Sequence, residues 1–230
     1  MQKKYLILCA LLSLFLCLIS SVAFAATNEP PKPLRLARVP LVVRAYSADA
    51  EVEDIIENRL DLALHVPLND TMHYVEEIPQ SEVESALNDV LADLKTKHRR
   101  VKMKDAMQPL AEKLDADLVV CPVLTTYYEY IYYGGGGWSW DSMSDTMILD
   151  SDATVELDGY DRIAQENFSQ SASRYYHEGF HPTGRAAMLA KDALENLVSA
   201  TEINKRVMRP VRNRATAGSL SEGAVSRMAD

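Results

Sequence analysis

Two spacings of hydrophobic residues alternate along the chain, and each change of spacing marks the boundary of an expected element. Residues 34–43 form a nearly continuous apolar run, which predicts a buried strand. From Ser47 the apolar positions recur every three or four residues, as on one face of a helix, and Pro67 ends that pattern. A second, short strand is expected over residues 72–78.

Two further helices are expected after the second strand. The first begins near Ser81, because Ser81 and Glu84 have the spacing of a capping box, and its apolar positions form a single stripe. The second would be capped by Asp105 and would end at Leu114. Pro109 would be tolerated within or next to its first turn, where few intrahelical hydrogen bonds are lost.

The second half of the chain predicts three neighbouring strands and a final helix. Residues 118–133 begin as an unbroken apolar run and continue with alternation, and residues 146–158 alternate throughout. Residues 167–176 alternate more weakly and are interpreted as the partner strand beyond a turn at 159–164. The last strong pattern is helical, over about residues 183–206.

Together these patterns predict an α/β fold that borders on α+β. A mixed sheet of about five strands would be flanked by four helices in one compact domain over residues 34–205. Three prolines make residues 26–33 a stiff leader. Residues 206–230 are mostly small, polar or basic and are expected to form a disordered tail.

Residues 1–25 have the features of a secretory signal peptide. Two lysines precede an apolar run without acidic residues, and Ala23-Phe24-Ala25 supplies a small-x-small cleavage site. An uncleaved membrane anchor is the alternative, because the apolar stretch approaches the ~20 residues that span a bilayer. Cys9 and Cys17 both follow leucine, so neither has the context of a lipid-anchor site. We therefore expect an exported protein of the periplasm or cell envelope, soluble after cleavage near Ala25, with no stable membrane span.

Charge and cysteine content exclude several classes of protein. Removal of residues 1–25 takes away two lysines and no acid, which changes the net charge from −9 to −11. Nucleic acid is therefore not an expected partner. Cys121 would be the one cysteine left, so no disulfide could form within the chain. Basic residues concentrate in residues 95–104 and after Asn204, the two places where an anionic partner would bind.

One motif points to an enzyme. The string His177-Glu178-Gly179-Phe180-His181 has the H-E-x-x-H spacing of zinc peptidases, in which a helix places two imidazoles on one face. Gly179 lies inside this segment and Pro182 follows it, and both residues disfavour a helix. A pair of loop histidines, with no catalytic residue, metal site or cofactor, is the preferred interpretation. A zinc metallohydrolase that uses His177, Glu178 and His181 is the alternative.

Seven aromatic residues flank a run of four consecutive glycines. Tyr128, Tyr130 and Tyr132 would share one face of a strand, and Trp138 and Trp140 follow the glycines. Amphipathic rings beside a glycine-rich tip suit contact with a protein, a glycan or a membrane interface. These five residues form the predicted partner-binding site; the alternative is that part of the rings simply packs on the sheet.

Three segments together have a recognisable order: the opening strand at 36–43, the run 110–120, in which a helix passes through a small-Asp step into a central strand, and the segment 155–161, which ends in Tyr-Asp. They resemble a family of small envelope domains with an anticodon-binding-like fold, typified by the amino-terminal domain of TolB, the curli secretion component CsgG and the penicillin-binding-protein activator LpoB. The resemblance covers about residues 34–205 and carries no catalytic signature. The chain departs from these proteins in lacking a lipobox and the β-propeller that follows the TolB domain.

What the resemblance implies is a non-enzymatic envelope module that binds another envelope protein or a second copy of itself. The aromatic hairpin between residues 127 and 140 is the surface expected to make that contact. A carbohydrate-binding module, in which the same rings stack on sugars, is a further alternative to the zinc hydrolase.

Overall fold

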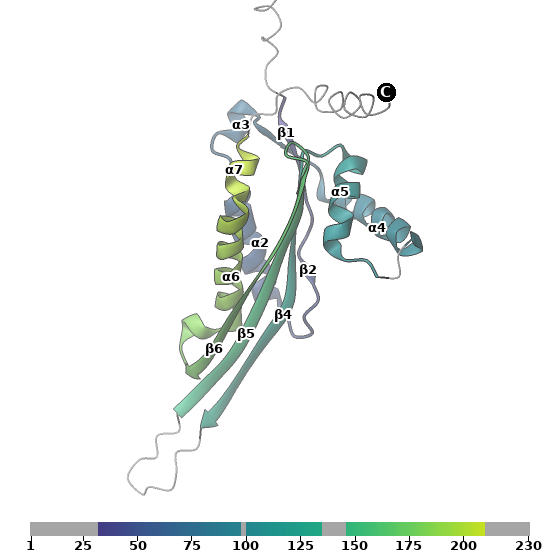
Figure 1. Ribbon diagram of the computed structural model, residues 1–230. Coiled ribbons are helices and arrows are strands. Elements are labelled where there is room, and N and C mark those ends of the chain that lie inside the picture. Colours follow the sequence, from purple (N-terminus) through teal and green to yellow (C-terminus); the bar gives the residue numbers. More distant parts are fainter. Residues whose placement is uncertain (1–31, 98–99, 135–145, 210–230) are drawn as a thin grey trace, which may run out of the picture. The chain divides into compact units, whose positions relative to one another are not determined.

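The computed structural model describes residues 32–97, 100–134 and 146–209, and it has the α/β architecture that the sequence predicts (Figure 1). Its strands are β1 (Leu34–Arg38), β2 (Val42–Val43), β3 (Val75–Glu77), β4 (Leu118–Gly134), β5 (Thr146–Asp161) and β6 (Glu166–Gly179). Its helices are α2 (Ala50–Leu64), α3 (Asn69–Met72), α4 (Gln80–Lys97), α5 (Met103–Leu114), the 3-10 helix η1 (Pro182–Gly184), α6 (Ala186–Thr201) and α7 (Ile203–Val207).

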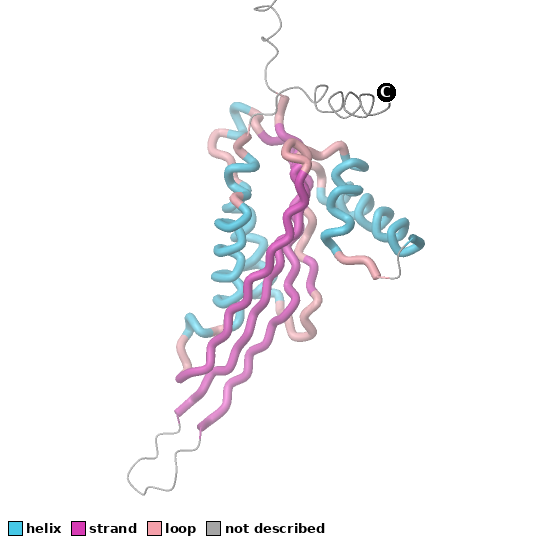
Figure 2. Tube along the Cα trace, viewed as in Figure 1, coloured by secondary structure: helices cyan, strands magenta, loops and turns pink. Residues whose placement is uncertain are grey.

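The strands form one mixed sheet in the order β3-β1-β4-β5-β6, and β2 pairs with β4 further along the same edge. β1 runs parallel to both β3 and β4, whereas β4, β5 and β6 are antiparallel to one another. The antiparallel strands are far longer than the parallel ones, as the magenta segments of Figure 2 show. The sheet therefore has a short parallel part and a long antiparallel extension.

The two faces of the sheet are covered to different extents. Figure 1 shows α2 and α6 on one side and α4 and α5 on the other, where they lie beside the upper part of the strands. Each pair of helices packs on its own buried hydrophobic cluster. The first cluster includes Leu36, Ile56, Val120, Leu124 and Leu194. The second includes Ala37, Val83, Leu110, Val119 and Cys121.

A single extra residue changes which side chains of β4 face each layer. The pairing with β5 shifts between Leu124 and Thr126, which makes Thr125 a β-bulge. Before the bulge, Val120 and Leu124 belong to the cluster under α2 and α6; after it, Tyr127 belongs to that cluster. Because neighbouring side chains of a strand point to opposite faces, the bulge directs the even-numbered tyrosines after it to the other face.

The first expected strand is divided in two. Residues 34–43 form β1 and β2, and the chain leaves the ladder around Pro40, which has no N–H group to donate to a neighbouring strand. The second expected strand, over residues 72–78, is shorter than its prediction. Met72, the first residue of that expected range, instead ends the short helix α3, and only Val75–Glu77 forms a strand.

Two helix starts also differ from the expectations. α4 begins before Ser81, so Ser81 and Glu84 both lie inside the helix and do not form the expected capping box. In α5, Lys102 is the capping residue, and Asp105 accepts a hydrogen bond from the Lys102 backbone N–H at 3.1 Å. Asp105 thus caps the amino-terminal end of α5 from within the first turn of the helix, not from the residue that precedes it. Pro109 lies in the second turn of α5, further inside the helix than expected.

The carboxyl-terminal part shows three corrections. β5 continues to Asp161, so residue 159 belongs to the strand and the turn occupies residues 162–165. The helix expected over residues 183–206 is divided into η1, α6 and α7, and Glu202 interrupts it with a left-handed φ of 52°. Because α7 continues to Val207, the folded body extends past the boundary that we expected at residue 205.

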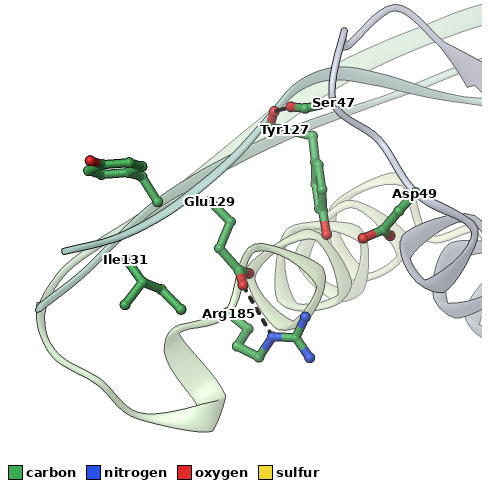
Figure 3. Close-up of a pocket in the computed structure, with 7 residues that line it drawn as sticks. Ser47, Asp49, Tyr127, Glu129, Ile131 and Arg185 are labelled. Atoms are coloured by element: carbon green, nitrogen blue, oxygen red, sulfur yellow. Dashed lines mark hydrogen bonds and ion pairs between the residues drawn. The ribbon is translucent and has the colours of Figure 1, made fainter. Parts of the chain in front are cut away.

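A polar junction fixes the far part of β4 to the start of α6. Glu129 on β4 accepts a hydrogen bond from the Ala186 backbone N–H at 2.9 Å and contacts Arg185 at 3.4 Å. Arg185 also pairs with Glu51 of α2 at 3.2 Å, and the two carboxylates raise the pKa of its guanidinium. Figure 3 shows Glu129 and Arg185 pointing toward each other. Both residues line a cavity of about 320 Å³. The junction therefore ties β4, α2 and α6 together.

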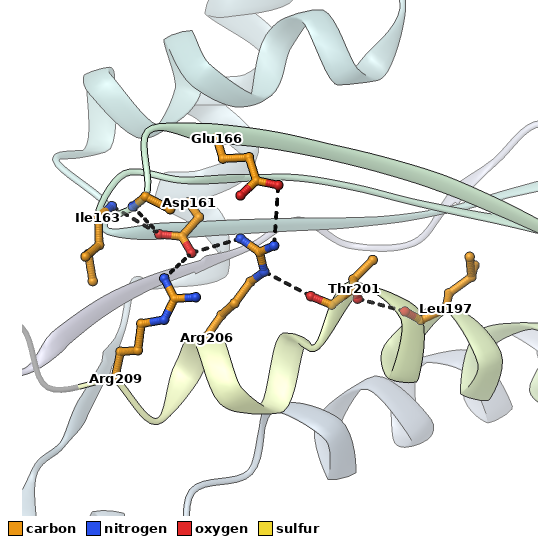
Figure 4. A network of polar contacts seen from close by, with 8 residues as sticks. Asp161, Ile163, Glu166, Leu197, Thr201, Arg206 and Arg209 are labelled. Carbon is orange, nitrogen blue, oxygen red and sulfur yellow. Dashed lines mark hydrogen bonds and ion pairs between the residues drawn. The ribbon is translucent and has the colours of Figure 1, made fainter.

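A second junction lies at the opposite end of β5. The buried Asp161 carboxylate accepts hydrogen bonds from Arg206 and Arg209, each at 3.0 Å, and from the backbone of the turn that follows it (Figure 4). The Arg206 guanidinium also lies over the Phe168 ring, 5.1 Å from its centre. α7 is thereby joined to both β5 and β6, although Arg206 and Arg209 fall in the segment that we expected to be a tail.

Gly159 makes room for this second junction. A Cβ atom there would collide with the Phe168 ring and with the Val119 carbonyl oxygen of the neighbouring strand. We expect Gly159→Ala to lower the free energy of unfolding by about 1–3 kcal/mol through this overpacking. Chemical denaturation measures the change. Gly179→Ala is the matched control, because a Cβ there meets no atom within 4 Å; equal stability of the two variants would contradict the packing described.

The Glu129 junction predicts a graded loss of stability. Glu129→Gln retains an oxygen that can accept from the Ala186 N–H but loses the ion pair with Arg185, and we expect a cost of about 1 kcal/mol. Glu129→Ala loses both contacts and should cost about 2–3 kcal/mol. Urea denaturation gives both values, with Glu178→Ala on exposed β6 as the control. An alanine variant no less stable than the glutamine variant would show that the N–H contact contributes nothing.

Candidate binding surface

The part of the sheet beyond the bulge has one face that no helix in the described ranges covers. We call this surface the open face. Its side chains come from β4, β5 and β6 and are Thr126, Tyr128, Tyr130, Tyr132, Ile148, Asp150, Asp152, Thr154, Ser173, Tyr175 and His177. The exposed fractions of three of its tyrosines are 43% for Tyr128, 56% for Tyr130 and 65% for Tyr175.

The register of the three strands places each aspartate of the open face between two rings. Asp152 lies opposite Tyr128 on β4 and opposite Tyr175 on β6. One row further along, Asp150 lies opposite Tyr130 and opposite His177. Directly opposed residues of antiparallel strands are about 4.5–5.5 Å apart at Cβ, so each carboxylate is bordered by aromatic side chains.

Four rings of the open face form a continuous arc. Tyr130 stacks on Tyr132 with ring centres 5.8 Å apart, and Tyr132 lies 6.3 Å from His177. His177 in turn stacks almost parallel on Tyr175 at 6.2 Å. The Tyr132 hydroxyl is 3.5 Å from His177 Nε2, and His177 Nδ1 is 3.7 Å from the Asp150 carboxylate. The rings of β4 and β6 therefore contact one another across β5, which lies between the two strands.

The tyrosines of the open face act as hydrogen-bond donors beside carboxylates. Tyrosine hydroxyls are protonated at neutral pH and can donate hydrogen bonds, and partial desolvation and then the nearby Asp150 charge raise the pKa of Tyr128 and Tyr175 further. One oxygen of Asp152 is buried and accepts no hydrogen bond from described residues, whereas Asp150 interacts with His177 and Tyr175. The surface thus offers apolar rings, hydroxyl donors and carboxylate acceptors side by side.

The end of the hairpin also exposes apolar side chains on its opposite face. Figure 1 shows β4 and β5 continuing beyond η1 and α6. Ile131 is 41% exposed and Tyr133 is 66% exposed, and Met147 and Phe180 are exposed beside them. Exposed apolar groups gathered at one place on a protein surface are typical of contact sites. Both faces of the hairpin end are therefore available for contact.

The structure brings together some of the residues predicted for partner binding. Tyr128, Tyr130 and Tyr132 lie on the open face, whereas Trp138 and Trp140 lie outside the described residues. Sequence reasoning missed Tyr175 and His177, although both fall in or beside the weakly alternating segment that was assigned to a partner strand. The alternating pattern of residues 167–176 could have placed them on a strand. Only the register with β5 shows that they lie beside the tyrosines of β4.

The H-E-x-x-H string does not have the geometry of a zinc peptidase. His177 and Glu178 belong to β6, so the expected loop is wrong for these two residues, and their side chains point to opposite faces of the sheet. His181 has an extended backbone and caps η1 by accepting from the Thr183 N–H. No helix places the two imidazoles side by side. Within the three described ranges, no group of three histidine, cysteine or acidic side chains is arranged to hold a metal ion.

Comparisons with known proteins find distant structural likenesses. No family model and no curated protein matches the chain. Similar solved structures include the lipoprotein GNA1162 from Neisseria meningitidis, which is 15% identical with a TM-score of 0.36, and the alignment covers 73% of this chain and 99% of that one. The C-terminal domain of LpoB from Salmonella enterica is 9% identical with a TM-score of 0.30, covering 67% of this chain and 90% of that one.

A dodecamer of PelC from Paraburkholderia phytofirmans is 12% identical with a TM-score of 0.32, covering 80% of this chain and 92% of that one. LpoB is one of the proteins that the sequence resembles, so this part of the resemblance recurs among the solved structures. Likenesses at this level of identity and TM-score carry no inference about function. In the part of the chain that the structure describes, no helix is long and apolar enough to cross a membrane.

Proposed function

We propose that this chain is an exported, non-enzymatic protein of the cell envelope that binds another protein through the open face of its β4–β5–β6 hairpin sheet. Export and location rest on the signal-peptide features of residues 1–25. The binding role rests on one observation above all. An arc of four rings in contact borders two aspartates on a sheet face that described helices leave uncovered.

The composition of the open face supports binding to a protein. Tyrosine is enriched at protein interfaces because its ring provides apolar contact area and its hydroxyl remains able to form a hydrogen bond. Three of the tyrosines are about half exposed or more, which is an unusual arrangement for rings whose only role is to pack on a sheet. The same side chains could stack on a sugar ring, so a glycan is a separate outcome of the test below.

The rigidity of the surface also supports this proposal. Binding to side chains that are already ordered costs less conformational entropy than binding that must first order them. β4 and β5 pair almost without interruption from Leu118 to Gly134, and the ring stacks restrict the side chains further. The Glu129 junction fixes the hairpin from the opposite face. The open face is therefore prepared for binding before a partner arrives.

Substitution of exposed tyrosines tests this proposal. We expect a variant with Tyr128→Ser, Tyr130→Ser and Tyr175→Ser to remain folded but to lose at least about tenfold of its association with protein partners, because the apolar contact area is removed. Quantitative co-purification from the cell envelope measures binding to other proteins. Sedimentation of the purified protein measures association between copies.

A matched control carries Tyr46→Ser and Tyr74→Ser, two exposed tyrosines outside the open face. Far-ultraviolet circular dichroism should give the same folded signal for all three proteins. Association that survives the open-face substitutions would rule out this surface. Association that is unaffected, together with a glycan whose binding is lost in the open-face variant, would favour the carbohydrate-binding alternative.

A further inference from the structure

A small polar cavity lies on the same side of the sheet as α5 and separate from the open face. Its volume is about 260 Å³, and its lining includes Arg44, Lys102, Lys104, Glu156, Asp158 and Ser169. The residues come from the start of α5, the end of β2 and the facing strands β5 and β6. Cavities that bind drug-sized molecules are usually about 300–1,000 Å³, so this one suits a smaller ligand.

Asp158 is the residue in this cavity that most needs an explanation. It is only 3% exposed, and its Oδ1 atom is buried with no hydrogen-bond partner in the described chain. No lysine, arginine or histidine of that chain lies within 4.0 Å of its carboxylate. Burial of a carboxylate without a partner costs several kcal/mol, so such groups normally hold a cation or a hydrogen-bond donor.

The residues paired with Asp158 in the sheet do not donate a hydrogen bond to its carboxylate. Cys121 lies opposite Asp158 on β4, and its sulfur hydrogen bonds elsewhere, to the Pro122 carbonyl oxygen. Burial and then the Asp158 charge raise the pKa of the Cys121 thiol, which therefore stays neutral. Ser169 lies opposite Asp158 on β6 and forms no hydrogen bond with it. Asp158 therefore retains a binding capacity that its neighbours do not use.

The cations of the cavity are also largely unused. Arg44 lies 4.0 Å from Glu156, at the limit of an ion pair. Lys102 and Lys104 are exposed and form no ion pair with described residues. The cavity therefore combines one buried carboxylate, that of Asp158, with the ammonium groups of Lys102 and Lys104, none of which has an ion-pair partner among the described residues. Asp158 and the two lysines all line this one cavity, whose volume suits a molecule the size of a single amino acid.

We infer that this cavity binds a small zwitterion, a free amino acid, whose ammonium group pairs with Asp158 and whose carboxylate pairs with Lys102 and Lys104. A purely anionic ligand would leave Asp158 without a partner and would be repelled by it. A purely cationic ligand would be repelled by the two lysines. A molecule that carries both charges satisfies all three groups at once, because charge-assisted hydrogen bonds are the stronger kind.

Titration of the full-length protein with free L- and D-amino acids tests this inference by calorimetry and thermal unfolding. We expect at least one amino acid to bind and to raise the unfolding temperature. Its N-acetyl derivative lacks the ammonium group and its amide lacks the carboxylate. Each should bind at least about tenfold more weakly, a loss of about 1.4 kcal/mol. Failure of every amino acid to bind, or equal binding of the derivatives, would overturn the inference.

Variants locate the site. Asp158→Asn should abolish binding while leaving the ligand-free protein as stable as the parent or more stable, because it removes a buried charge without a partner. Lys104→Gln should weaken binding, and Lys95→Gln on α4, outside the cavity, should not. Asp158→Asn with unchanged affinity, or with a markedly lower unfolding temperature, would contradict the inference. The open-face variant should bind the amino acid normally, so this test is independent of the proposed function.

Discussion

The bulge at Thr125 decides which side chains of the long hairpin meet the core and which remain exposed. In a regular strand, every second residue points to the same face, and one inserted residue exchanges the two sets. Without it, the even-numbered tyrosines would follow Leu124 toward α6 and α2. With it, Tyr127 enters the core and Tyr128 begins the open face. The binding surface thus depends on one extra backbone residue.

The bulge matters for binding because helices cover the two faces of the sheet to different extents. α2 and α6 bury their side of β4 and β5 up to Tyr127 and Ala153, whereas the cluster under α4 and α5 ends on β4 at Val123. The polar junction of Glu129 and Arg185 and the junction of Asp161 and Arg206 hold opposite ends of the antiparallel strands. The hairpin can therefore present an uncovered face and remain in a fixed position.

The sequence predicted the elements better than their junctions. Strands β4 and β5 were predictable because alternation persists over more than ten residues, and α4 and α5 because their apolar stripes are strong. The bulge was not predictable, because Thr125 and Thr126 are ordinary strand residues without a glycine or proline to mark it. The same is true of Glu202, which interrupts the final helix in a conformation that glycine usually adopts.

The site was predicted only in part, for the same reason. Three consecutive even-numbered tyrosines on one strand are visible in the sequence, and the structure places them on one face. Tyr175, His177 and the two aspartates join them through the pairing of β4 and β6 with β5, and long-range register is not encoded in local spacing. The helical spacing of H-E-x-x-H was likewise overridden by strand pairing, which separates His177 from Glu178.

Hydroxyl-radical footprinting of the tyrosines tests the central claim most directly, because it reports which rings a partner covers in the native protein. The protein is oxidised once in purified form and once in its cell-envelope preparation, and each tyrosine is quantified by mass spectrometry. We expect Tyr128, Tyr130 and Tyr175 to be protected in the envelope preparation and Tyr46 and Tyr74 to be unchanged. Equal oxidation of the open-face rings in both preparations would contradict this claim.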